Sequence, residues 1–100
     1  MPCTPEAVAA FQDAGVLFGP GKAANAGGVA TSALEMSQNA ARQRWGFADS
    51  EAKLRAIMQD VHDATFDAAE RYGRPGDYVA GANCAGFERV AWAMLAQGVI

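Results

Sequence analysis

The stretch that decides the fold runs from Gly15 to Trp45 and reads GVLFGPGKAANAGGVATSALEMSQNAARQRW. It opens with an apolar run, Val16 to Phe18, whose β-branched and aromatic residues favour a short strand. A Gly-Pro-Gly turn follows, and from Asn25 onward apolar residues recur at helical spacing. Strand, tight turn and helix start, with glycines at the junctions, are typical of a site where the backbone approaches a small anionic or amide-bearing ligand.

The turn does not match a phosphate-binding P-loop. That motif requires a glycine five positions before the glycine of its Gly-Lys pair, where this chain has Val16. Ala23 also replaces the serine or threonine that would reach Mg²⁺. Lys22 has no neighbouring cation of the kind that activates a catalytic lysine, so we interpret it as a surface or turn residue.

Composition excludes several classes of function. The 100 residues are 51% hydrophobic, which is enough for a core, and the formal net charge is −3. Without a cluster of lysine and arginine, a nucleic-acid partner is not expected. No apolar run approaches the ~20 residues that span a bilayer, and no secretory signal is visible, so we expect a cytoplasmic protein without a membrane partner. Cys3 and Cys84 are interpreted as free thiols in a reducing compartment.

Capping residues and helical periodicity predict four helices. Thr4–Glu6 supplies an N-cap, a proline at the first helical position and an acidic residue near the positive end of the helix dipole. Gly15 ends that helix, and Asp49 or Ser50 is the predicted N-cap of the third. The four predicted helices cover approximately residues 5–14, 25–44 or 25–45, 51–72 and 78–97.

The predicted fold is therefore mostly α, with three long helices, one short N-terminal helix and one short strand at residues 16–18. A single strand cannot satisfy its own backbone groups. It pairs either between copies of the chain or with strands outside these 100 residues.

Five segments resemble, in order, the C-terminal part of a known enzyme family. They are MPCTPEA (1–7), PGKAANAGGV (20–29), EMSQN (35–39), GAN with GF (81–83 and 86–87) and AMLAQGV (93–99). The chain resembles hexameric-type NADP-specific glutamate dehydrogenases of the Glu/Leu/Phe/Val dehydrogenase family over essentially its whole length. The resemblance implies that residues 1–45 are the C-terminal part of an α/β Rossmann-like cofactor domain, followed by C-terminal helices at 46–100.

Four residues near the start of the second long helix are the candidate site. From residue chemistry alone, Asn25 either caps the helix or presents its amide to a ligand, Gly28 permits close approach, and Val29 is an apolar surface. The Ser32 hydroxyl is able to donate to a carboxylate. The resemblance implies that Asn25 contacts the cofactor and that Gly28, Val29 and Ser32 bind substrate, with Ser32 on the side-chain carboxylate of glutamate or 2-oxoglutarate.

No catalytic residue and no metal ligand is predicted within the chain. His62 is the single histidine, and no acidic cluster at ligand spacing accompanies it, so its predicted role is structural. Trp45 and Trp92 are interpreted as packing residues. The GxGxxG fingerprint of dinucleotide sites is absent, and the family's catalytic lysine and aspartate belong to an earlier segment.

Two hypotheses follow. In the first, the chain is part of an enzyme that interconverts L-glutamate with 2-oxoglutarate and ammonia using NADP(H). That enzyme assembles as a homohexamer in the resembled family, and the 100-residue chain alone is inactive because the main NADP-binding determinants lie elsewhere. In the second, the chain is a free-standing, non-catalytic helical remnant or an interaction module that packs against a partner through its Ala-rich helices.

Overall fold

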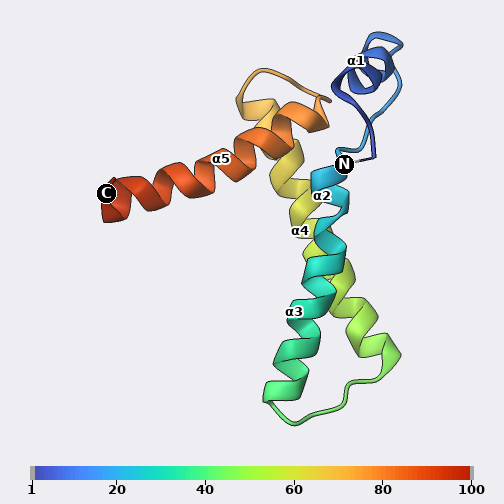
Figure 1. Cartoon of the computed structure of the whole chain (residues 1–100), viewed down its shortest axis with the longest axis vertical. Helices are drawn as coiled ribbons and strands as arrows, with labels where there is room; N and C mark the ends of the chain where they lie inside the picture. The colour runs from blue at the N-terminus through green and yellow to red at the C-terminus, as the bar shows by residue number, and fades with distance from the viewer. Residues whose placement is uncertain (1, 100) are drawn as a thin grey trace.

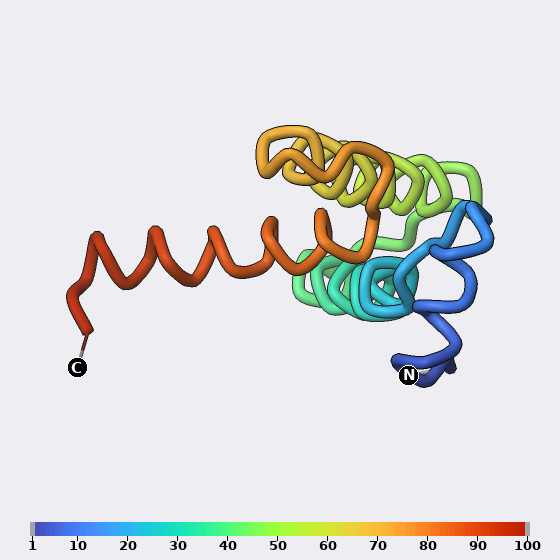
Figure 2. The backbone as a smooth tube through the Cα atoms, turned by 90° about the horizontal axis from the view of Figure 1, so that it is seen from above, coloured from blue at the N-terminus to red at the C-terminus, as the bar shows by residue number. Residues whose placement is uncertain are grey.

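The computed structural model describes residues 2–99 and is largely helical. Its elements are, in chain order, α1 (Pro5–Asp13), α2 (Gly21–Ala24), α3 (Ala26–Ala40), α4 (Phe47–Arg71) and α5 (Tyr78–Gln97). Figure 1 shows α3 and α4 side by side and antiparallel, while α5 crosses α4 and projects away from the other helices. The view from above in Figure 2 shows the C-terminal half of α5 standing clear of the rest. The predicted mostly α fold, with three long helices and a short N-terminal helix, is confirmed.

Two helices begin at side-chain caps, of which the first, at Thr4, was predicted. The Thr4 hydroxyl accepts a hydrogen bond from the backbone N–H of Ala7 at 3.3 Å and caps α1. Asp77 caps α5 in the same way, by accepting from the N–H of Ala80 at 2.9 Å. After α1, Gly15 has φ +70°, a left-handed conformation that glycine adopts at little cost.

The third element in the chain, α3, ends at Ala40, several residues before the predicted end at 44 or 45. Arg42 turns into the left-handed region at φ 54°, where glycine is the usual residue. The N–H of Gln43 then donates to the carbonyl of Gln38 at 3.0 Å, which closes the helix end. The Gln38 side chain also accepts from the N–H of Trp45 at 2.7 Å. These bonds satisfy carbonyl and amide groups that a longer helix would have paired.

The predicted start of α4 is also wrong. The helix begins at Phe47, and Gly46 occupies the N-cap position with an extended backbone, φ −68° and ψ 163°. Asp49 lies inside the first turn, where its charge faces the positive end of the helix dipole. The N–H of Ser50 donates to the carbonyl of Gly46 at 3.1 Å, so neither Asp49 nor Ser50 is the N-cap.

The predicted strand at residues 16–18 does not form within the described residues, 2–99. A strand requires a partner for its backbone groups, and this stretch of chain supplies none. The segment is instead held from α1: the N–H of Val16 donates to the carbonyl of Phe11 at 3.0 Å, and the rings of Phe11 and Phe18 stack at 5.6 Å.

The most buried contact is the crossing of α4 and α5, which small residues make possible. The buried residues of this crossing are Thr65, Ala68, Ala69 and Gly81. A methyl group on Gly81 would overlap the carbonyl oxygen of Thr65, so the two backbones approach as closely as a glycine allows. Farther along α5, Glu88 accepts hydrogen bonds at 2.7 and 2.9 Å from Arg71, the last residue of α4, and from Tyr72, which follows it.

Much apolar surface stays uncovered in this arrangement. The accessible surface is 7502 Å², whereas about 5,400 Å² is typical of a compact protein of this mass. The radius of gyration is 16.4 Å, against about 13 Å for a compact domain of 100 residues. On α5, Phe87 and Trp92 are each 68% exposed, and Leu95 is 76% exposed. Among the described helices, none combines the length and apolarity that crossing a membrane requires.

We expect Gly81→Ala to lower the free energy of unfolding by about 1–3 kcal/mol, because the added methyl group has to push α5 away from Thr65. Gly86→Ala is the matched control in the same helix, since no described atom lies within 4 Å of its added methyl position. That control should raise the free energy of unfolding by about 0.5–1 kcal/mol. Urea unfolding followed by circular dichroism measures both, and equal effects would contradict the close crossing.

Candidate functional site

The structure brings the four predicted site residues together on one side of α3. Asn25, Val29 and Ser32 are spaced four and three residues apart, which places them on the same helix face, and Gly28 lies between them. All four are exposed. We call this surface the Asn25–Ser32 face.

The structure bears on one of the two predicted roles of Asn25, that of a helix cap. Its backbone is already helical, with φ −64° and ψ −23°, because Asn25 is the single residue between α2 and α3. A capping residue has an extended backbone, and in the described structure the Asn25 side chain makes no capping hydrogen bond. The capping interpretation is therefore wrong, and the carboxamide is available to a ligand.

The two consecutive glycines of α3 face different surroundings. A methyl group on Gly27 would come within 3.3 Å of the sulfur of Met58, so Gly27 allows α3 to pack closely on α4. The corresponding position on Gly28 has no described atom within 4 Å. Of the two glycines, Gly28, where close approach of a ligand was predicted, is thus the one with open space beside it.

The Ser32 hydroxyl donates to the carbonyl of Gly28 at 3.3 Å, within the helix. This long bond to a backbone carbonyl is one that serine exchanges readily for a stronger acceptor. A carboxylate above Gly28 would be such an acceptor, and hydrogen bonds to charged groups are shorter and stronger. The arrangement suits a hydroxyl that turns from its own helix toward an anionic ligand.

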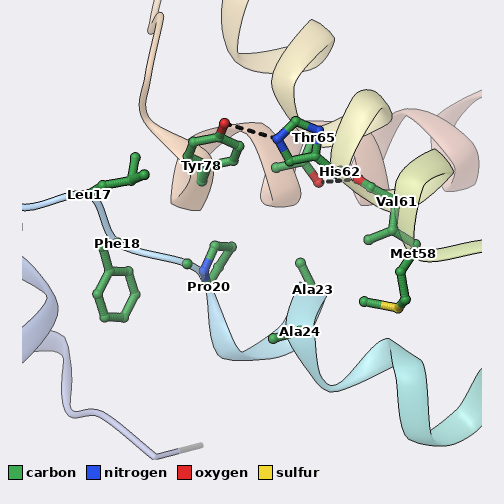
Figure 3. A pocket seen from close by; sticks show the side chains of 11 residues that line it. Leu17, Phe18, Pro20, Ala23, Ala24, Met58, Val61, His62, Thr65 and Tyr78 are labelled. Atoms are coloured by element: carbon green, nitrogen blue, oxygen red, sulfur yellow. Dashed lines mark hydrogen bonds between the residues drawn. The ribbon is translucent and has the colours of Figure 1, made fainter. Parts of the chain in front are cut away.

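A cavity of about 350 Å³ separates the segment at residues 17–20 from α4 (Figure 3). Its lining is mainly apolar, and its polar groups come from His62, Thr65 and Tyr78. The Nε2 atom of His62 lies 3.1 Å from the Tyr78 hydroxyl, and Nδ1 lies 3.0 Å from Asp63. Hydrogen bonds from His62 and then Gln59 lower the pKa of Asp63. This geometry agrees with a structural role for His62, which joins α4 to α5.

The start of α5, residues 77–83, shares a hydrogen bond with each of three elements. Besides the contact of Tyr78 with α4, the Gln12 amide of α1 donates to Asp77 at 3.0 Å. From α2, Lys22 Nζ donates to the Asn83 side-chain oxygen at 2.6 Å. Sequence reasoning missed the contact of Lys22, because its partner lies 61 residues away and no local pattern joins the two.

Two further groups of residues bear on reactive chemistry: the cysteines and the side chains able to ligate a metal. Cys3 and Cys84 are half-buried and are not joined by a disulfide. Within the part of the chain that the structure describes, no three His, Cys, Asp or Glu side chains are arranged to hold a metal ion.

Comparison with known proteins identifies the family. The model of the Glutamate/Leucine/Phenylalanine/Valine dehydrogenase family matches residues 1–98. The chain belongs to this dehydrogenase family. It is 60% identical over 100 residues to the NADP-specific glutamate dehydrogenase of Escherichia coli K12, and 51% identical over 104 residues to the glutamate dehydrogenase of Bacteroides thetaiotaomicron. Each match covers the whole of this chain and 22% of the relative.

Solved structures of dehydrogenases in this family share the fold. One glutamate dehydrogenase superimposes with a TM-score of 0.89 at 46% identity, over 99% of this chain and 22% of that one. A Plasmodium falciparum glutamate dehydrogenase 2 gives a TM-score of 0.89 at 42% identity, over 98% of this chain and 22% of that one. The open arrangement of the helices is thus one that longer dehydrogenases contain.

The Asp77 carboxylate makes the stability of this dehydrogenase segment depend on pH. The N–H of Ala80, and then Arg74, lower the pKa of Asp77 below its usual 3.8. Its contribution to stability is therefore complete above the unfolded pKa and is lost as pH falls through the folded pKa.

We expect the melting temperature of the unaltered chain to fall more steeply than that of Asp77→Asn once the pH drops below about 4. Asparagine caps helices about as well as aspartate but does not titrate. Asp77→Ala should lose about 1 kcal/mol at every pH, because it removes the cap. Thermal unfolding followed by circular dichroism measures the slopes, and identical slopes for the unaltered chain and Asp77→Asn would contradict this role.

Proposed function

We propose that this chain forms one wall of the active site of a glutamate dehydrogenase that interconverts L-glutamate with 2-oxoglutarate and ammonia using NADP(H). The observation that carries the proposal is the exposed Asn25–Ser32 face, in a chain 60% identical to an NADP-specific glutamate dehydrogenase. Its oxygen and nitrogen donors, open backbone and apolar patch suit a dicarboxylate next to a nicotinamide.

Each residue of the face has a distinct binding role in this proposal. The Asn25 carboxamide, which both donates and accepts hydrogen bonds, meets the nicotinamide or its ribose. The bare backbone of Gly28 lets the substrate approach, and Val29, which is 70% exposed, is the apolar surface beside it. Ser32 turns its hydroxyl from the Gly28 carbonyl to the side-chain carboxylate of the substrate.

The chain supplies binding and orientation only. When bound, NADP(H) supplies or accepts the hydride, and the reacting groups have to be held together at near-attack distance. The proposed catalytic lysine and aspartate, and the residues that read the NADP phosphate, lie in other parts of the longer dehydrogenase. We therefore expect no turnover from the 100-residue chain by itself.

The uncovered surface supports the same proposal. Residues 1–45 would complete a Rossmann-like cofactor domain, and residues 46–100 would be C-terminal helices that pack on the remainder of the enzyme. Apolar residues lie all along α5, a pattern typical of a helix that a larger protein surrounds. A cytoplasmic homo-oligomer, a hexamer in the resembled family, is part of this proposal.

A second candidate rests on the same exposed surface. The apolar side chains of α5, among them Phe87 and Leu95, are also what a free-standing interaction module would present to a protein partner. In that case the Asn25–Ser32 face would carry no ligand, and the enzyme family would describe only the ancestry of the chain.

We expect Ser32→Ala, in the full-length dehydrogenase that carries this segment, to raise the KM for 2-oxoglutarate roughly 10- to 100-fold, because a hydrogen bond to a charged carboxylate is lost. Ser37→Ala is the matched control: its hydroxyl also donates to a helix carbonyl, that of Ala33 at 2.9 Å, but from another side of α3. The control should leave the KM unchanged. Initial rates of NADPH oxidation measure both, and an unchanged KM in Ser32→Ala would contradict the proposed role.

A further inference from the structure

The contact between Lys22 and Asn83 joins α2 to α5 at the surface, where both side chains are exposed. Lys22 Nζ donates to the Asn83 side-chain oxygen at 2.6 Å. Lys22 also lines two open hollows, one of about 610 Å³ together with Val79 and one of about 570 Å³ together with Trp92. Because α2 packs mainly on α3 and α4, the hydrogen bond of Lys22 with Asn83 is its polar link to α5.

Asn83 is the fixed end of this contact. It follows the buried Gly81 by two residues, on the part of α5 that lies against α4. The same turns of α5 are held by Gln12 through Asp77 and by His62 through Tyr78, at 3.0 and 3.1 Å. These hydrogen bonds therefore fix the position of Asn83 relative to α1 and α4.

Lys22 connects its hydrogen bond with Asn83 to the position of the Asn25–Ser32 face. It lies in α2, which has four residues and is joined to α3 through Asn25 alone. The Asn25 N–H donates to the carbonyl of Gly21 at 2.8 Å, and the Gly28 N–H donates to the carbonyl of Asn25 at 3.1 Å. A displacement of α2 therefore moves Asn25 and the first turn of α3 with it.

We propose that Lys22 and Asn83 form a positioning pair that sets the Asn25–Ser32 face relative to α5. The inference rests on the proposed function for its effect on substrate binding, but its structural part does not. Lys22 is neither a nucleophile nor a base in this proposal: its ammonium group donates a charge-assisted hydrogen bond to a neutral amide. Losing either partner lets α2 shift, so that Asn25 and Ser32 no longer meet the ligand in one geometry.

The test uses the full-length dehydrogenase that carries this segment. Four variants are compared: Lys22→Met, Asn83→Ala, the double variant and Asn83→Asp. Each single removal should raise the KM for 2-oxoglutarate roughly tenfold, with a smaller change in kcat. The double variant should be no worse than either single variant, because both remove the same bond. Asn83→Asp keeps the acceptor oxygen and should stay within about twofold of the unaltered enzyme.

Lys53→Met is the matched control, since it removes the other lysine of the chain, whose ammonium lies 4.9 Å from the Trp45 ring centre. It should leave the KM unchanged. Hydrogen exchange gives a readout that does not depend on activity: the amides of residues 25–28 should exchange several times faster in Lys22→Met, with an unchanged melting temperature.

Two results would overturn the positioning pair: a double variant whose KM change equals the product of the single changes, or amides at 25–28 that exchange at the unaltered rate. A full-length protein that exchanges as expected but never reduces 2-oxoglutarate would overturn the proposed function and leave the pair standing. The two failures are therefore distinguishable.

Discussion

The close crossing of α4 and α5 at Gly81 is the contact on which the other long-range contacts depend. Because Gly81 has no side chain, the first turns of α5 lie directly on the backbone of α4 at Thr65. This depth of contact brings residues 77–83 within hydrogen-bond distance of α1, α2 and α4. A larger residue at position 81 would move α5 away from all of these partners at once, because they all bond to the same two turns of α5.

The two glycines of α3 determine how the candidate site is placed against α4. Gly27 lets α3 approach Met58 on α4, and this contact turns Gly28 toward open space. The face that results is shaped by packing on the opposite side of the helix. The two adjacent glycines thus have different roles: Gly27 allows α3 to pack on α4, and Gly28 leaves its backbone open to a ligand.

Sequence reasoning succeeded where the determinant is local. The Thr4 cap predicted the start of α1, the spacing of apolar residues predicted the start of α5, and the four residues of the Asn25–Ser32 face were predicted to lie together. It failed where the determinant is a partner far along the chain or an unusual backbone. Arg42 ends α3 in a conformation that glycine usually adopts, residues 16–18 lack a strand partner, and the Lys22–Asn83 bond joins residues 61 positions apart.

The excess of exposed apolar surface supports the central proposal, that this segment works as part of a longer dehydrogenase. The most direct measurement is the apparent mass of the polypeptide in the cell that produces it, using an antibody raised against this segment. We predict a band several times larger than 10.4 kDa, in keeping with relatives of which this chain covers 22%. A band near 10.4 kDa would contradict it and would favour the free-standing interaction module.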